Sequence, residues 1–343
     1  MGRKLTYLAT TALLLTVALT GCQQEPLPDA VIRFSVSPVG MDASSTKAIA
    51  DTDKPTDGSS LIFDESKVKL YGHLTPVGGT KTAVFTGKEL KCTESSGAFS
   101  WGYTPVVYWE REAAYDFLAV FPYDASTSGD SINGLTVDYK MQKDVSGTMQ
   151  RSDCDLMVAS ASVTSAPPAN NTVNLTFNHA CAAVRFVFKD PDLGTNDPSK
   201  YTVKSFELQG LYTDNTYDVS AGAWNAWAAT ASRAAHVWAW SGSGAVKAAY
   251  DYLWTPTAAM PGWYFAIPQE LDATDSKISF TYTVGDSTQV LPVTLNLVTS
   301  NITKWELGKV YTYKIQIRAN AIDFDVTWTD WVSGHDDFNF VGD

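Results

Sequence analysis

Two runs near the end of the chain, YTYKIQIR (residues 311–318) and IDFDVTWT (residues 322–329), alternate between apolar and polar side chains. In a β-strand, successive side chains point to opposite faces, so each run offers one apolar face to a core and one polar face to water. The short connection between the runs predicts an antiparallel hairpin. Residues 278–284 and 290–297, which are divided by Gly285-Asp286, predict a second hairpin of the same kind.

Further short apolar runs, separated by Gly, Pro and polar stretches, indicate more strands upstream. These runs cover residues 31–36, 61–63, 68–74, 83–85, 103–109, 115–121 and 155–159. Residues 124–134 are polar and are expected to form a loop. Between residues 173 and 188 the apolar positions change parity after His179, which predicts a bulge or a crossing from one packing layer to another.

Length and composition favour two all-β domains. The 343 residues suit two domains of ordinary size, and 45% of them are hydrophobic. Thr, Val, Tyr and Trp are plentiful, which favours β structure. We expect an N-terminal domain over residues 31–170 and a C-terminal domain over residues 171–343. The net charge of −12 makes nucleic acid an unsuitable partner, because phosphate contacts need Lys and Arg.

The first residues have the pattern of an export signal. Arg3 and Lys4 precede an apolar run over residues 5–20, which is too short to span a bilayer and is typical of a signal peptide over residues 1–21. The run ends in LTGC (residues 19–22), which resembles a bacterial lipobox. We therefore expect lipidation at Cys22, a tether over residues 22–30, and attachment to a membrane through the lipid. Gln23 after the cysteine agrees with delivery to the outer membrane.

No motif indicates catalysis, a metal or a cofactor. The histidines His73, His179, His236 and His335 are isolated from one another. His179 lies on an apolar strand face, where a hydrogen-bonded core histidine is expected rather than a metal ligand. We expect that the chain is not an enzyme.

Three cysteines remain downstream of Cys22, namely Cys92, Cys154 and Cys181. The sequence contains no C-x-x-C motif. Buried thiols are the first interpretation, and a bridge between Cys154 and Cys181 is the alternative.

A stretch rich in tryptophan leaves two alternatives open. Trp224, Trp227, Ala231 and Trp238 could line one face of a helix, whereas Trp238 and Trp240 fit a strand. These rings could fill a core or line a groove between subunits, and they could also form a platform for sugar rings.

The segments in order resemble the fimbrillin family, the FimA-like and Mfa-like subunits of type V pili. The resemblance covers nearly the whole chain. It rests on the lipobox, on an early strand followed by TKA (residues 46–48), and on four later segments. These are YDFLAVFP (115–122), DLMVA (155–159), VNLTFNH (173–179) and the run from Trp305 through GKVYTY (308–313) to Asp330-Trp331.

The resemblance implies two transthyretin-like β-sandwich domains and an assembly mechanism. A trypsin-like protease would cut after a basic residue, here between Lys47 and Ala48, and would remove the strand that carries Ile32, Phe34 and Val36. A strand from the C-terminal end of another subunit would then fill the groove. The expected function is that of a structural pilus subunit, of the stalk or a minor or tip position, serving adhesion at the cell surface. The alternative is a surface glycan-binding lipoprotein of a nutrient-uptake system.

Overall fold

The computed structural model is built almost entirely of β-strands. It describes residues 30–38, 66–96, 98–141, 155–164, 167–191, 200–247, 264–318 and 321–330, with the side chains of 238–247 left out. A three-residue 3₁₀ turn, η3 (Ala169–Asn171), accompanies the strands. Within these ranges there is no helix with the length and hydropathy needed to cross a membrane. The expected all-β fold class is confirmed.

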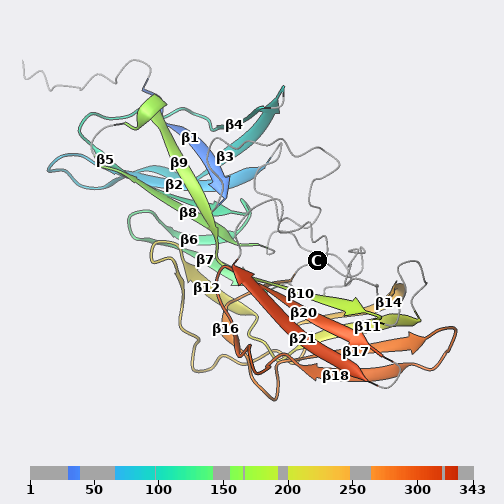
Figure 1. Ribbon diagram of the computed structural model, residues 1–343. Coiled ribbons are helices and arrows are strands. Elements are labelled where there is room, and N and C mark those ends of the chain that lie inside the picture. Colours follow the sequence, from blue (N-terminus) through green and yellow to red (C-terminus); the bar gives the residue numbers. More distant parts are fainter. Residues whose placement is uncertain are drawn as a thin grey trace, which may run out of the picture.

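A seven-stranded sheet occupies the N-terminal part (Figure 1). Its strands lie in the order β1 (Arg33–Pro38), β9 (Thr172–His179), β8 (Met157–Val163), β5 (Ala114–Phe121), β2 (Lys67–Thr75), β3 (Thr82–Ser95) and β4 (Ala98–Gly102). The β1–β9 pair is parallel, and the other neighbours are antiparallel. One face of this sheet encloses a hydrophobic core to which β1, β2, β5 and β9 all contribute side chains.

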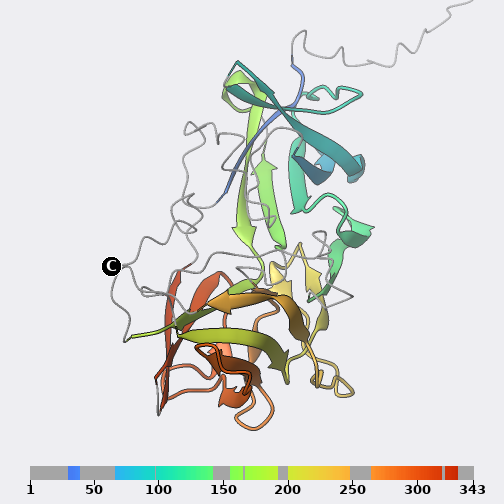
Figure 2. The ribbon, with the colours of Figure 1, turned by 90° about the vertical axis from the view of Figure 1, so that its right-hand side faces the viewer.

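Two four-stranded sheets pack face to face in the C-terminal part, below the first sheet in Figure 2. One has the order β15 (Tyr264–Ala266), β10 (Ala182–Lys189), β20 (Lys309–Ile317) and β21 (Ile322–Asp330). The other has the order β14 (Trp238–Lys247), β11 (Tyr201–Gln209), β17 (Lys277–Val284) and β18 (Leu291–Asn296). Aromatic rings join the sheets, since Phe186 of β10 meets Phe206 of β11 with ring centroids 5.0 Å apart.

Both predicted hairpins are confirmed. β20 and β21 pair antiparallel with Tyr313 opposite Val326, and β17 and β18 pair antiparallel with Phe280 opposite Val293. The strand predicted at residues 31–36 is present as β1, and Trp238 and Trp240 belong to the strand β14 rather than to a helix. The expected run at 61–63 lies outside the described residues.

The predicted change of parity marks the crossing from one sheet to another. Along β9 the buried positions include Val173, Leu175 and Phe177, which face the N-terminal core. After the break at residues 180–181, β10 places Phe186 and Phe188 in the second core. The crossing lies within ten residues of the boundary expected at 170–171, and the division into two transthyretin-like domains stays a prediction.

A smaller sheet joins the two parts of the chain, and it corrects one expectation. β6 (Ser126–Asp130) and β7 (Gly134–Lys140) pair with each other, and β7 pairs with β12 (Asp214–Asp218), which continues to β13 (Ala223–Trp224). The polar loop expected over residues 124–134 is therefore wrong, because Ser and Thr can occupy a strand whose partner supplies the apolar residues.

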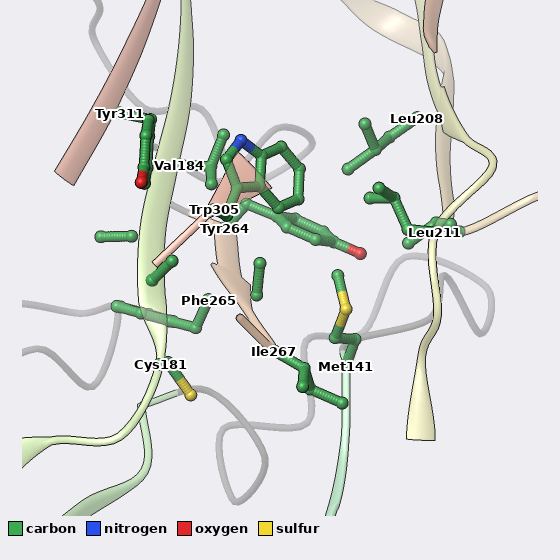
Figure 3. Close-up of a cluster of buried hydrophobic side chains, with 14 of the residues drawn as sticks. Met141, Cys181, Val184, Leu208, Leu211, Tyr264, Phe265, Ile267, Trp305 and Tyr311 are labelled. Atoms are coloured by element: carbon green, nitrogen blue, oxygen red, sulfur yellow. The ribbon is translucent and has the colours of Figure 1, made fainter. Parts of the chain in front are cut away.

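The second core draws side chains from both parts of the chain. Figure 3 shows Met141, which follows β7, near Tyr264 in the cluster that also contains Trp305. Trp305 belongs to β19 (Lys304–Trp305), which pairs with β16 (Gln269–Glu270), and its indole donates to the Tyr313 hydroxyl at 3.0 Å. The contributions of Met141 and the β7 strand tie the N-terminal part to the C-terminal sandwich.

Candidate functional site

The strand β1 lies at one end of the seven-stranded sheet (Figure 1). The slot that β1 fills is the candidate site. β1 runs parallel to β9, with Phe34 opposite Val173 and Val36 opposite Leu175. A parallel neighbour cannot be reached by a tight turn, so β1 is held here by long-range contacts alone. The chain that follows β1, residues 39–65, lies outside the described residues.

The alternate side chains of β1 are part of the N-terminal core. Ile32, which immediately precedes β1, and Phe34 and Val36 of β1 are 0%, 5% and 6% exposed, respectively. Burying three side chains of this size contributes about 5–9 kcal/mol in total, at about 1.5–3 kcal/mol each. If β1 left the sheet, this apolar surface and the backbone edge of β9 would both meet water.

Phe34 occupies an aromatic pocket within the slot. Its ring meets Phe117 of β5 at 5.3 Å, Phe85 of β3 at 5.8 Å and Tyr103 at 5.8 Å between centroids, in each case edge to face. Edge-to-face pairs of this kind add about 0.5–1.5 kcal/mol each beyond burial. The pocket is therefore shaped for an aromatic side chain.

The other wall of the slot is the segment of residues 103–109, which we call the strap. The Ile32 amide donates to the Val107 carbonyl at 2.9 Å, and the Trp109 amide donates to the Ala30 carbonyl at 2.8 Å. The Tyr103 hydroxyl donates to the Ile32 carbonyl at 2.7 Å. β1 is thus hydrogen-bonded on one edge to β9 and, at its beginning, on the other edge to the strap.

The strand predicted at residues 103–109 is wrong. The strap makes a single β-bridge, between Tyr108 and Val31, and is otherwise irregular. Pro105 has no N–H to give to a ladder, which prevents a continuous strand at this place.

The predicted lipidation and cleavage residues cannot be placed. Cys22, Lys47 and Ala48 lie outside the described residues. Lys47 and Ala48 belong to the connection between β1 and β2, so a cut there would separate β1 from the rest of the chain.

The tryptophans proposed for glycan or groove contacts lie apart from the slot. Trp224 donates its indole N–H to the Ala180 carbonyl at 2.7 Å and packs against the second core. Trp227 stacks on Tyr212 at 4.4 Å between ring centroids. Trp238 and Trp240 pair in β14 with Leu208 and Phe206, and their side chains are not described.

The titratable side chains that the structure describes form no recognisable catalytic arrangement. His179 is buried and contacts Asp155 through Nδ1 at 3.0 Å, which confirms a hydrogen-bonded core histidine. His73 is buried with Nε2 3.1 Å from the Asp116 carboxylate, and the exposed His236 contacts Glu207. Among the described residues, His, Cys, Asp and Glu side chains nowhere gather in a group of three or more that could hold a metal ion.

The described cysteines Cys92 and Cys181 are both buried. Cys154 and His335 lie outside the described residues, so the Cys154–Cys181 bridge stays a prediction.

The residues of the strap were missed as site residues by the sequence analysis. Residues 103–109 form an apolar run that predicts a strand. In the structure they form one wall of the slot that β1 fills. The signal that could have identified these residues is Pro105, because a proline inside an apolar run argues against a strand in the interior of a sheet.

The chain belongs to the fimbrillin-like family, whose sequence profile matches residues 52–331. No curated protein matches the chain. Among solved structures, a fimbrial protein from Bacteroides vulgatus is 17% identical with a TM-score of 0.55, and the match covers 88% of this chain and 99% of that chain. A proposed cell adhesion protein from Bacteroides ovatus is 13% identical with a TM-score of 0.54, and the match covers 90% of this chain and 99% of that chain. At these identities the likeness shows the fold.

Proposed function

We propose that the chain is a structural subunit of a type V pilus, of the stalk or a minor or tip position, serving cell adhesion. Membership of the fimbrillin-like family and the likeness to fimbrial and adhesion proteins support a pilus subunit at the cell surface. A lipid on Cys22 would carry the precursor to the outer membrane. Its partners would be other pilus subunits and a trypsin-like maturation protease, and no step needs a cofactor or an enzymatic activity of this chain.

The observation that carries the proposal is the position of β1. Its side chains complete a core, yet it lies at the end of its sheet and is separated from the next strand by the connection that contains Lys47 and Ala48. A cut in that connection would leave β1 held by non-covalent contacts alone. An extended segment of another subunit could then take its place, with its backbone bonded to β9 and its alternate side chains in the slot.

A second strand of the chain has the side chains that the slot accepts. β21 begins Ile322-Asp-Phe324-Asp-Val326-Thr327, and it matches Ile32-Arg-Phe34-Ser-Val36-Ser37 in its three apolar residues and in the hydroxyl residue that follows. β21 is the end strand of its own sheet, where Ile322 and Phe324 are half-buried. The equivalent residues Ile32 and Phe34 are buried more completely, so the slot of another copy would bury the two β21 side chains more fully than the end of their own sheet does.

Limited trypsin digestion of the folded protein tests the proposal. We expect the first cut between Lys47 and Ala48, followed by oligomers in size-exclusion chromatography. Lys47→Gln is the matched control and should delay both events. If the protein is cut at this bond, loses its first strand and remains monomeric at high concentration, the proposed assembly is wrong.

Lipidation is tested separately. Palmitate fed to expressing cells should label the precursor and should not label the Cys22→Ser variant. Equal labelling of the two proteins would place the acyl chain elsewhere.

A further inference from the structure

We propose that Tyr103 and the aromatic pocket of Phe34 together select the strand that occupies the slot and fix its register. The inference rests on the proposed strand replacement and names its specificity-determining residue. The occupant that the slot accepts is an extended segment of a second copy, parallel to β9, with an aromatic side chain two residues after the carbonyl that Tyr103 binds.

The Tyr103 ring is part of the pocket wall. It meets Phe34 with centroids 5.8 Å apart and Phe85 of β3 at 5.2 Å, and in both pairs the rings are edge to face. Phe34 and Phe85 are 5% and 3% exposed, so an occupant with a smaller side chain at this position would leave a cavity among three rings.

The Tyr103 hydroxyl contacts the backbone of the occupant rather than a side chain. It donates to the Ile32 carbonyl at 2.7 Å and accepts the Val107 amide at 3.3 Å. Burial raises the pKa of Tyr103, which keeps the hydroxyl protonated and able to donate at neutral pH. Because a backbone carbonyl is the acceptor, any strand in the register of β1 can form this bond.

The two contacts exclude different errors of register. Successive carbonyls of a strand point to opposite edges, and successive side chains point to opposite faces. A shift by one residue removes the carbonyl from the Tyr103 hydroxyl and turns polar side chains toward the core. A shift by two residues restores a carbonyl but moves the aromatic ring out of the pocket. The register of β1 is therefore the only nearby one that satisfies both contacts.

The test uses the full-length protein with Asn174→Cys, cut with trypsin and exchanged with excess synthetic peptide of residues 30–38. Position 174 lies opposite Ser35, and the Ser35 hydroxyl donates to Asn174 Oδ1 at 3.2 Å, so a cysteine at position 35 of the peptide reports the native register. A peptide with cysteine at position 33 reports a shift by two residues. The ratio of the two disulfide-linked products, measured by mass spectrometry, is the readout.

With Tyr103 present, we expect at least a tenfold preference for the position-35 peptide. Tyr103→Phe keeps the ring, and we expect it to reduce that preference to below threefold and to weaken binding of the native peptide about fivefold. A peptide in which Phe34 and Val36 are exchanged should bind at least tenfold more weakly than the native one. Tyr212→Phe, in the C-terminal part and apart from the slot, is the matched control and should change nothing.

An unchanged register preference in Tyr103→Phe would overturn the inference while leaving strand replacement intact. If no peptide is captured at any position after the native strand has been released, the proposed function fails instead.

Discussion

Replacement of Phe34 by alanine measures how much β1 contributes to the N-terminal core. The ring is 5% exposed and touches three aromatic neighbours, of which Phe117 is the nearest at 5.3 Å. Phe-to-Ala changes in packed cores cost about 3–5 kcal/mol. Because β1 lies at the end of its sheet and can relax toward the cavity, we expect the lower end of that range, about 3 kcal/mol.

Urea unfolding, followed by tryptophan fluorescence, measures this change. Trp109 lies in the same core and should report the loss directly. Ser35→Ala is the matched control on the same strand, because Ser35 is on the outward face, and we expect it to change the free energy of unfolding by less than about 0.5 kcal/mol. A Phe34→Ala protein that unfolds within about 1 kcal/mol of the unchanged protein would refute the view that β1 completes this core.

Three further predictions concern the rest of the fold. Gly210 has a φ of +72°, and a Cβ at this position would collide with a neighbouring carbonyl, so Gly210→Ala should lower the free energy of unfolding by about 2–3 kcal/mol. Gly78 has a φ of +68° but lies in open space, so Gly78→Ala should cost only about 1 kcal/mol. Equal losses of stability in thermal unfolding would contradict the collision at Gly210. Asp155→Ala removes the hydrogen-bond partner of buried His179 and should lower the free energy of unfolding by about 3 kcal/mol at neutral pH. Asp155→Asn should lower it clearly less. A larger loss of stability in Asp155→Asn than in Asp155→Ala would exclude a hydrogen-bonding role for Asp155. Burial raises the pKa of Tyr311 to about 12, so the contribution of this protonated side chain to stability is complete below pH 10 and is lost as the pH rises from 10 to 12. Tyr311→Phe should therefore make the free energy of unfolding less dependent on pH in that window. An unchanged pH dependence would show that Tyr311 is not its source.

The predictions from sequence succeeded where the pattern was local. The β20–β21 hairpin follows from alternation over residues 311–318 and 322–329 with a short connection between them. The change of parity after His179 also carried real information, because the apolar positions of β9 and β10 face two different cores. The periodicity of side chains is a property of a single strand, so it can be detected without knowing which strand is its partner.

The predictions failed where the partner decided the structure. β6 is a polar run that forms a strand because β7 pairs with it and supplies Leu135 and Val137 to the core. The strap is an apolar run that forms no regular strand, because Pro105 interrupts it and its hydrogen bonds go to Ala30 and Ile32. The parallel pairing of β1 with β9 joins residues far apart in the chain, and no local pattern specifies such a neighbour.

The central claim, that β1 must leave its slot before subunits can assemble, is tested most directly by locking the strand in place. Ser35 and Asn174 lie opposite each other on β1 and β9, and their side chains are in contact, so Ser35→Cys combined with Asn174→Cys should form a disulfide. After trypsin cleavage we predict that the oxidised protein stays monomeric and that the same sample forms oligomers once the disulfide is reduced. Oligomers that form equally fast with the disulfide intact, or that fail to form after reduction, would contradict the account.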